Sequence, residues 1–184
     1  NYALITYVNE SDIYYIFSNL LLVKENEFYK EYPSSTKLAY MADASRNAVM
    51  SVDTAKKLLR HLAVFGYDRF LLYTEDTYQI KEYPYFGYLR NAYSKEDFKA
   101  IIDYANLFGI EVVPCIQTLA HLNTLTRHAS MEHLFDVNDI LLVDNEETYK
   151  FIEAMIKTCR ECYTCDEIHI GMDETMRIGK GTYL

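Results

Sequence analysis

The sequence predicts an α/β fold, a parallel β-sheet whose strands alternate with helices as in the first four βα units of a (β/α)8 TIM barrel. Three observations support this prediction. Short apolar runs alternate with longer segments of helical periodicity, the pair Phe-Gly recurs before a strand at 65–66 and 108–109, and polar residues follow each apolar run. The chain has 184 residues, half of them hydrophobic, whereas a complete barrel typically needs about 250. We therefore expect half a barrel.

The first elements follow from local signals. Residues 1–36 are expected to be a strand-and-loop lead-in segment, and the first barrel strand is predicted at 37–42. A helix is predicted at 54–66, because apolar side chains recur at helical spacing and Gly66 can cap its C-terminus. The second strand is predicted at 69–74.

The second part of the chain repeats this plan. Ser94 is expected to cap a helix at 94–109, with Asp97 in the capping-box position. The remaining predicted elements are a strand at 110–116, a helix from 146 to about 162, and a strand at 167–171.

Two architectures fit this alternation, a doubly wound open sheet and the first half of a barrel. No G-x-G-x-x-G or G-x-x-x-x-G-K-[ST] motif follows any predicted strand, which removes the usual nucleotide-binding reason for an open sheet. We favour the half barrel and expect no cofactor.

The charge balance excludes some partners. The 18 Lys and Arg residues against 27 Asp and Glu give a net charge of −9, which repels nucleic acid phosphates and anionic membranes. No apolar run approaches the roughly 18 residues needed to span a bilayer, and the start of the chain does not resemble a secretory signal. We expect no nucleic acid or membrane partner, and a neutral or weakly charged substrate.

The polar residues after the predicted strands are the candidate site. The carboxyl ends of parallel barrel strands open on one face, so these residues are expected to converge on one pocket. The fourth run ends in adjacent carboxylates, Asp173 and Glu174, which suit acid/base chemistry. For Asp43, Glu75 and Asp76 the alternative is that they cap the following helices.

The segment Ile168-His-Ile-Gly-Met-Asp-Glu174 resembles the His-x-Gly-Gly-Asp-Glu signature of glycoside hydrolase family 20, the β-N-acetylhexosaminidases, with Met172 in place of the second Gly. Segments 43–47, 73–76 and 114–121 are similar to the family's first three strand-end motifs, in family order and spacing. The third departs from the commoner Pro-Glu-Ile-Asp-x-Pro-Gly-His at Cys115, Gln117, Leu119 and Ala120. These departures point to the hexosaminidase D-like branch of the family.

The resemblance implies that residues 37–184 are the N-terminal half of the catalytic barrel of an exo-β-N-acetylhexosaminidase. Such an enzyme releases terminal β-linked N-acetylglucosamine or N-acetylgalactosamine by substrate-assisted retaining catalysis. Glu174 would be the general acid, in surroundings that raise its pKa. Asp173 would support the substrate's own 2-acetamido group, which is the nucleophile.

The resemblance also implies binding residues and no metal. Arg46 would hold sugar hydroxyls through its fork of donors, and Glu75 and Asp76 would accept from hydroxyls, with the capping alternative open. His121 and His169 would be polar supports in the pocket wall, although a histidine is also often a satisfied core residue.

The absence of Trp agrees with a half barrel. Family members hold the acetamido group in a Trp-lined cage supplied by later strands, while this chain has 18 Tyr and no Trp. We therefore expect the isolated piece to be inactive and to self-associate through its open sheet edge.

Two rival interpretations remain at this stage. Cys159, Cys162 and Cys165 form C-x-x-C-x-x-C, close to an iron–sulfur or zinc ligand run, but only Cys115 could be a fourth ligand and no Pro follows the run. We prefer reduced thiols of a cytosolic protein. The other rival is a non-catalytic sugar-binding module with the same pocket, which the intact Asp173-Glu174 pair disfavours.

Overall fold

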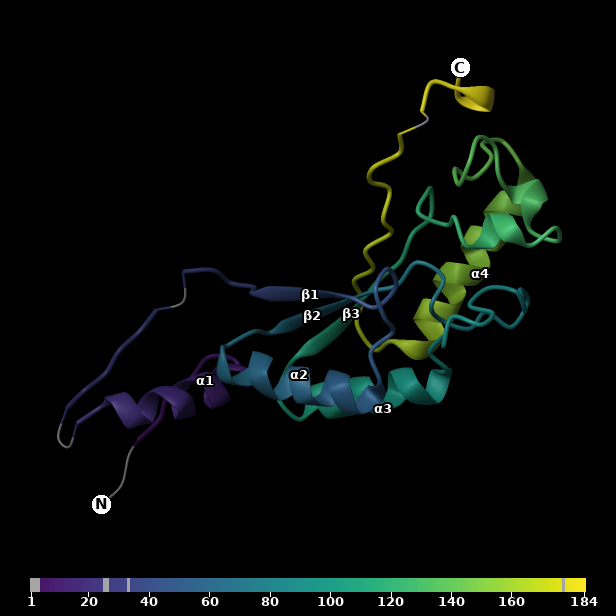
Figure 1. Ribbon diagram of the computed structural model, residues 1–184. Helices are drawn as coiled ribbons and strands as arrows, with labels where there is room; N and C mark the ends of the chain where they lie inside the picture. Colours follow the sequence, from purple (N-terminus) through teal and green to yellow (C-terminus); the bar gives the residue numbers. More distant parts are fainter. Residues whose placement is uncertain (1–3, 25–26, 33, 177) are drawn as a thin grey trace.

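The computed structural model describes residues 4–24, 27–32, 34–176 and 178–184 (Figure 1). The α-helices and strands, in chain order, are α1 (Asp12–Asn19), β1 (Ala39–Asp43), α2 (Val52–Val64), β2 (Arg69–Tyr73), α3 (Lys95–Asn106), β3 (Glu111–Cys115) and α4 (Glu146–Cys162). Short 3-10 helices lie at Leu20–Leu22, Leu125–Arg127, Glu132–Leu134 and Gly181–Tyr183. The predicted alternation of strands and helices is confirmed from β1 through α4.

The three strands form a parallel sheet in the order β1-β2-β3. Figure 1 shows α2 and α3 side by side along one face of this sheet. Phe70, Leu72 and Val112 are buried in the core beneath them. The last residues of the strands share one register line, since Tyr73 pairs with both Asp43 and Cys115. This register brings the loops after all three strands to the same edge of the sheet.

The predicted fourth strand is shorter than expected. Residues 167–171 run beside β3, where the His169 N–H donates to the Pro114 carbonyl and the Ile116 N–H donates to the His169 carbonyl, both at 2.9 Å. Only one parallel bridge forms there, between Cys115 and His169. The chain then turns at Gly171, whose φ is 55°, so pairing does not extend into a regular strand. The expectation of a full strand is corrected.

This fourth segment also separates the two candidate architectures. In a doubly wound sheet the strand order reverses, and the next strand returns to the side of the first. Here the chain continues beside β3, as it does in the wall of a barrel. The structure is a partial α/β fold with a three-stranded parallel sheet, and this continuation beside β3 agrees with part of a barrel wall.

The lead-in segment was expected to contain a strand, and in its described part it contains α1 instead. This helix packs against α2, and the Tyr14 hydroxyl donates to the Leu107 carbonyl at 3.0 Å. A Cβ added to Gly109 would lie 2.7 Å from the Ser11 backbone nitrogen, and one added to Gly66 would lie 3.2 Å from the Tyr15 ring. The two Phe-Gly pairs therefore end their helices and also leave room for α1 to dock, a long-range contact that local sequence signals do not contain.

Side-chain caps start the three barrel helices. The capping box of Ser94 and Asp97 at α3 is present as predicted. Ser51 caps α2, accepting from the Thr54 N–H at 3.2 Å, and Asn145 caps α4. The capping alternative for Asp43, Glu75 and Asp76 is therefore wrong.

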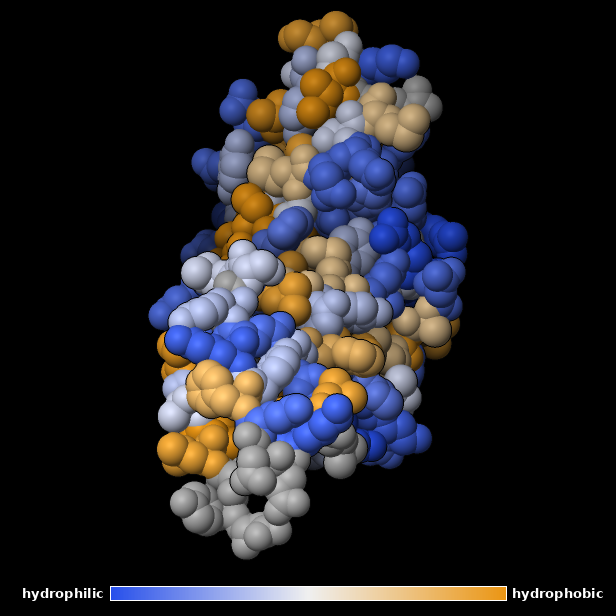
Figure 2. Space-filling view, turned by 90° about the vertical axis from the view of Figure 1, so that its left-hand side faces the viewer, coloured by the Kyte–Doolittle hydropathy of each residue, from blue (hydrophilic) through white to orange (hydrophobic). Residues whose placement is uncertain are grey.

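The sheet is open along β1, which pairs only with β2 within the described chain. Tyr40 and Met41 of this strand are exposed. Hydrophobic residues are also exposed at the upper end of Figure 2, where the C-terminal segment lies in Figure 1. No helix among the described residues is long and apolar enough to cross a membrane.

Candidate active site

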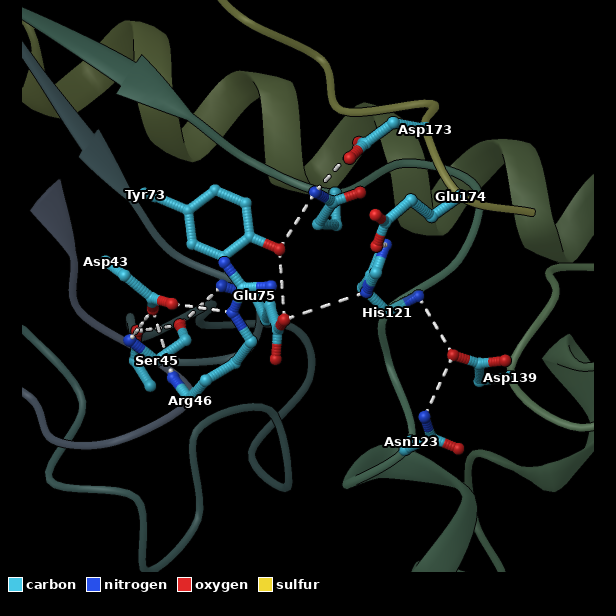
Figure 3. Close-up of polar contacts among 12 residues, drawn as sticks. Asp43, Ser45, Arg46, Tyr73, Glu75, His121, Asn123, Asp139, Asp173 and Glu174 are labelled. Atoms are coloured by element: carbon cyan, nitrogen blue, oxygen red, sulfur yellow. Dashed lines mark hydrogen bonds and ion pairs between the residues drawn. The ribbon is translucent and has the colours of Figure 1, made fainter. Parts of the chain in front are cut away.

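The loops that follow the strands bring most of the predicted site residues to one place (Figure 3). Asp43 and Arg46 come from the end of β1, Glu75 from the end of β2, and His121 from the loop after β3. The fourth segment supplies the remaining carboxylates. These are Asp173 and Glu174.

The adjacent carboxylates have different neighbours. Asp173 accepts a hydrogen bond from Gln117 Nε2 at 3.3 Å, whereas Glu174 Oε2 lies 3.6 Å from His121 Nε2. The Glu174 side chain is 71% exposed, so its carboxyl group is open to a ligand. The two neighbouring carboxylates thus have different surroundings at one edge of the sheet.

The environment keeps Asp173 ionised. Burial would raise the pKa of Asp173, but the hydrogen bonds from its own N–H and from Gln117, with the charges of His121 and His169, outweigh burial and lower this pKa below its ordinary value. An anion is therefore available at Asp173 to stabilise positive charge that develops nearby.

Glu75 lies at the base of the site. Its Oε1 accepts from the Tyr73 hydroxyl at 3.0 Å and lies 3.9 Å from His121 Nδ1. Burial raises the pKa of Glu75, and the Tyr73 hydrogen bond and the His121 charge oppose that shift only in part. His121 therefore stands between two carboxylates, Glu75 on its Nδ1 side and Glu174 on its Nε2 side.

Asp76 does not share this position. Its side chain is only 2% exposed, and its oxygens accept from Arg90 Nε at 3.1 Å and from the Thr124 hydroxyl. Arg90 in turn donates to the Ser45 carbonyl at 2.7 Å. Asp76 thus connects the loops after β1, β2 and β3, and both of its carboxylate oxygens accept hydrogen bonds from within the protein.

Arg46 lies at the mouth of the site. Its Nε donates to Asp43 Oδ2 at 2.6 Å, and its guanidinium carbon lies 5.0 Å from the centre of the Tyr73 ring. The side chain is about half exposed. Its terminal nitrogens donate no hydrogen bond to the described part of the chain, which leaves them for a ligand.

The remaining predicted residue, His169, lies on the fourth segment opposite Cys115. It is exposed. The backbone of His121 is fixed by Asp139, whose Oδ2 accepts from the His121 N–H at 3.0 Å and from Asn123 Nδ2 at 3.1 Å.

Residues 39–179 match the family model described as glycosyl hydrolase family 20, catalytic domain. The chain belongs to this family. Hexosaminidase D of Bos taurus is 32% identical over 108 residues, which cover 54% of this chain and 31% of that protein. Hexosaminidase D of Homo sapiens is also 32% identical over 108 residues, covering 54% of this chain and 22% of that protein. The match thus spans less than a third of the length of these relatives.

Solved structures of family 20 enzymes share the fold. The exo β-N-acetylglucosaminidase of Vibrio harveyi superposes with a TM-score of 0.75 at 19% identity, over 89% of this chain and 33% of that one. The β-N-acetylhexosaminidase of Streptomyces coelicolor A3(2) gives a TM-score of 0.69 at 24% identity, over 78% and 34%.

The cysteine-based rival is not supported in this family 20 chain. All four cysteines are free, and burial raises the pKa values of Cys115 and Cys159 to about 12, so both are thiols at neutral pH. Among the described residues, the group of His, Cys, Asp and Glu side chains that could hold a metal ion is His121, Asp173 and Glu174, whose ligand atoms lie within 4.8 Å of one another. Asp173 and Glu174 are exposed, and exposed acidic groups are common without a bound ion, so we assign no metal to them.

Three residues of this family 20 site were not predicted to be part of it. Tyr73 stands in the second motif and Gln117 in the third, so the motifs contained a signal for both. Asp139 follows no strand and belongs to no motif, and only its contact with His121 reveals it.

Proposed function

We propose that the protein to which this chain belongs is an exo-β-N-acetylhexosaminidase that releases terminal β-linked N-acetylglucosamine or N-acetylgalactosamine from glycans or glycoconjugates. The observation that carries the proposal is the division between the two adjacent carboxylates. Asp173 accepts hydrogen bonds from its own N–H and from Gln117, which lower its pKa, while Glu174 is exposed beside His121. Substrate-assisted hydrolysis needs one carboxylate that stays charged and another that exchanges a proton.

The reaction has two steps. The substrate's acetamido oxygen attacks the anomeric carbon, the bond to the leaving oxygen breaks, and Glu174 gives that oxygen a proton. Asp173 stabilises the positive charge of the resulting oxazolinium-like ring. Water then attacks the anomeric carbon and gives a proton to Glu174. Two displacements at one carbon retain its configuration.

The surrounding residues suit binding of a sugar. Arg46 has guanidinium nitrogens left for hydroxyls, and Glu75 offers carboxylate oxygens beside it. Asp76 is assigned to holding the loops, because its oxygens are already engaged. His121 and His169 support the carboxylates of the fourth segment.

The complete catalytic domain would be a (β/α)8 barrel to which this chain supplies the first four units. The exposed Tyr40 and Met41 of β1 agree with a wall that later strands complete.

The test uses the complete enzyme with aryl β-N-acetylglucosaminide and the matching aryl β-glucoside. The glucoside lacks the acetamido nucleophile and should be nearly inert. Equal rates on both substrates would overturn the substrate-assisted mechanism. Binding of N-acetylglucosamine without hydrolysis of either substrate would favour a sugar-binding module instead.

A further inference from the structure

Gln117 is a fully buried amide between two of the site's strand ends. It lies two residues beyond the end of β3. Its Nε2 lies 3.1 Å from the Tyr73 hydroxyl and 3.3 Å from Asp173 Oδ1. A single side chain therefore contacts both the second strand end and the fourth.

The neighbours of Gln117 fix the orientation of its amide. The Tyr73 hydroxyl gives its proton to Glu75 Oε1 at 3.0 Å, so the Tyr73 oxygen accepts from Gln117. The Asp173 carboxylate can only accept. Both neighbours require the amide nitrogen, and its two protons satisfy both.

The fourth motif leaves room for this amide. A Cβ added to Gly171 would lie 2.7 Å from Gln117 Oε1 and 2.1 Å from the Ile116 carbonyl. Real Cβ atoms do not approach other atoms so closely, so the glycine at 171 allows the third and fourth motifs to pack together. The commoner third motif has Asp at the place of Gln117, and a carboxylate there could not donate to Asp173.

We propose that Gln117 is a positioning residue that holds the Asp173 carboxylate toward the substrate's acetamido group and links it through Tyr73 to Glu75. The resulting chain of hydrogen bonds connects the carboxylates of Asp173 and Glu75 through two uncharged side chains. The catalytic role of Gln117 rests on the proposed function, whereas its hydrogen bond to Asp173 can be tested without measuring activity.

The experiment compares Gln117→Met and Gln117→Glu in the complete enzyme. Met keeps the length of the side chain and removes both donors, and Glu also places a second carboxylate beside Asp173. Loss of a hydrogen bond to a charged group should lower kcat by about tenfold to a hundredfold. The acid limb of the kcat/KM profile should move to higher pH for Met and further for Glu, because like charges oppose the ionisation of Asp173.

A double-mutant cycle separates positioning from structural support. In an Asp173→Asn background, Gln117→Met should lower kcat by less than about threefold, because the hydrogen-bond partner of Gln117 is already altered. The control is Thr118→Val, which removes the bond from the adjacent Thr118 hydroxyl to the Ile170 carbonyl (2.9 Å). It should lower thermal stability and leave the acid limb in place.

A third readout is independent of activity. The Asp173 pKa, measured by carboxyl ¹³C NMR, should rise in Gln117→Met and in Gln117→Glu. An unchanged Asp173 pKa in both variants, or additive losses in the cycle, would overturn the role of Gln117. An unsubstituted enzyme that cleaves no aryl N-acetylhexosaminide would instead overturn the proposed function, while a raised Asp173 pKa would still support the Gln117 bond.

Discussion

His121 Nε2 lies 3.6 Å from Glu174 Oε2, and both residues have left-handed backbone torsions, with φ of 61° and 50°. Such torsions cost a non-glycine residue on the order of 1–3 kcal/mol and persist where the surrounding structure holds them. Asp139 holds the His121 backbone by accepting from its N–H. The pairing turns Glu174 toward His121 while Asp173 faces Gln117, so the two carboxylates are expected to respond differently to substitution.

Glu174→Gln should impair substrates with poor leaving groups most. The change removes the proton donor, and an aryl glycoside with an acidic phenol needs little protonation to depart. The measurement is kcat/KM across a series of aryl β-N-acetylglucosaminides with phenols of different pKa. A steeper dependence on leaving-group pKa than in the unsubstituted enzyme is expected.

Asp173→Asn provides the comparison in the same series. It removes the charge that stabilises the oxazolinium-like ring, which forms whatever the leaving group. All members should slow by a similar factor, on the order of a hundredfold or more. Leaving-group dependence in Asp173→Asn and none in Glu174→Gln would reverse the two assignments.

Glu75→Gln should stabilise the complete enzyme more at pH 7 than at pH 4. Burial raises the Glu75 pKa above its ordinary value of 4.5. The stability that this group contributes is present below the unfolded pKa and is lost as the pH rises through the folded pKa. Gln removes the buried charge and can still accept from Tyr73. Thermal unfolding from pH 4 to pH 7 measures the difference.

Asp173→Asn should instead lower the thermal stability of the complete enzyme, and by more at pH 7 than at low pH. The reason is that hydrogen bonds lower the Asp173 pKa despite burial. The stability contributed by this group is present above the unfolded pKa and lost as the pH falls through the folded pKa. The same trend with pH in both variants would contradict the distinct environments of Glu75 and Asp173.

Gly109→Ala should destabilise the complete protein by about 1–2 kcal/mol, the cost of a left-handed torsion in a residue with a Cβ, and by more through contact with α1. The new Cβ would lie 2.7 Å from the Ser11 nitrogen. Gly179→Ala is the matched control, since Gly179 also has positive φ (84°) but no atom within 4 Å of an added Cβ. Urea unfolding and proteolysis of the lead-in segment measure the two effects. Equal effects in both variants would show that α1 does not dock at Gly109.

The isolated 184-residue chain should self-associate. β1 has an open edge with Tyr40 and Met41 exposed, and Ile170 and Met172 of the fourth segment are 43% and 55% exposed. Unpaired edges with apolar side chains favour association. Sedimentation over a range of concentrations should show oligomers, and Met41→Lys should reduce them. A monodisperse monomer at every concentration would contradict the expectation.

Local signals in the sequence predicted the order of the elements from β1 to α4, the capping box at Ser94 and the strand-end motifs. These features depend on neighbours within a few residues, such as the periodicity of α3 or the hydrogen bond between Ser94 and Asp97. Local patterns of this kind can be recognised without knowing which distant segment lies alongside.

Which polar residues share the site depends on contacts between segments that are distant in the sequence. Gln117 and Asp173 are 56 residues apart, and Asp76 and Thr124 are 48 apart. Glu75 and Asp76 are adjacent in sequence, yet one borders His121 and the other is buried against Arg90. The direction of each side chain depends on partners brought together by the sheet, and this is also why the docking of α1 on Gly66 and Gly109 was not predicted.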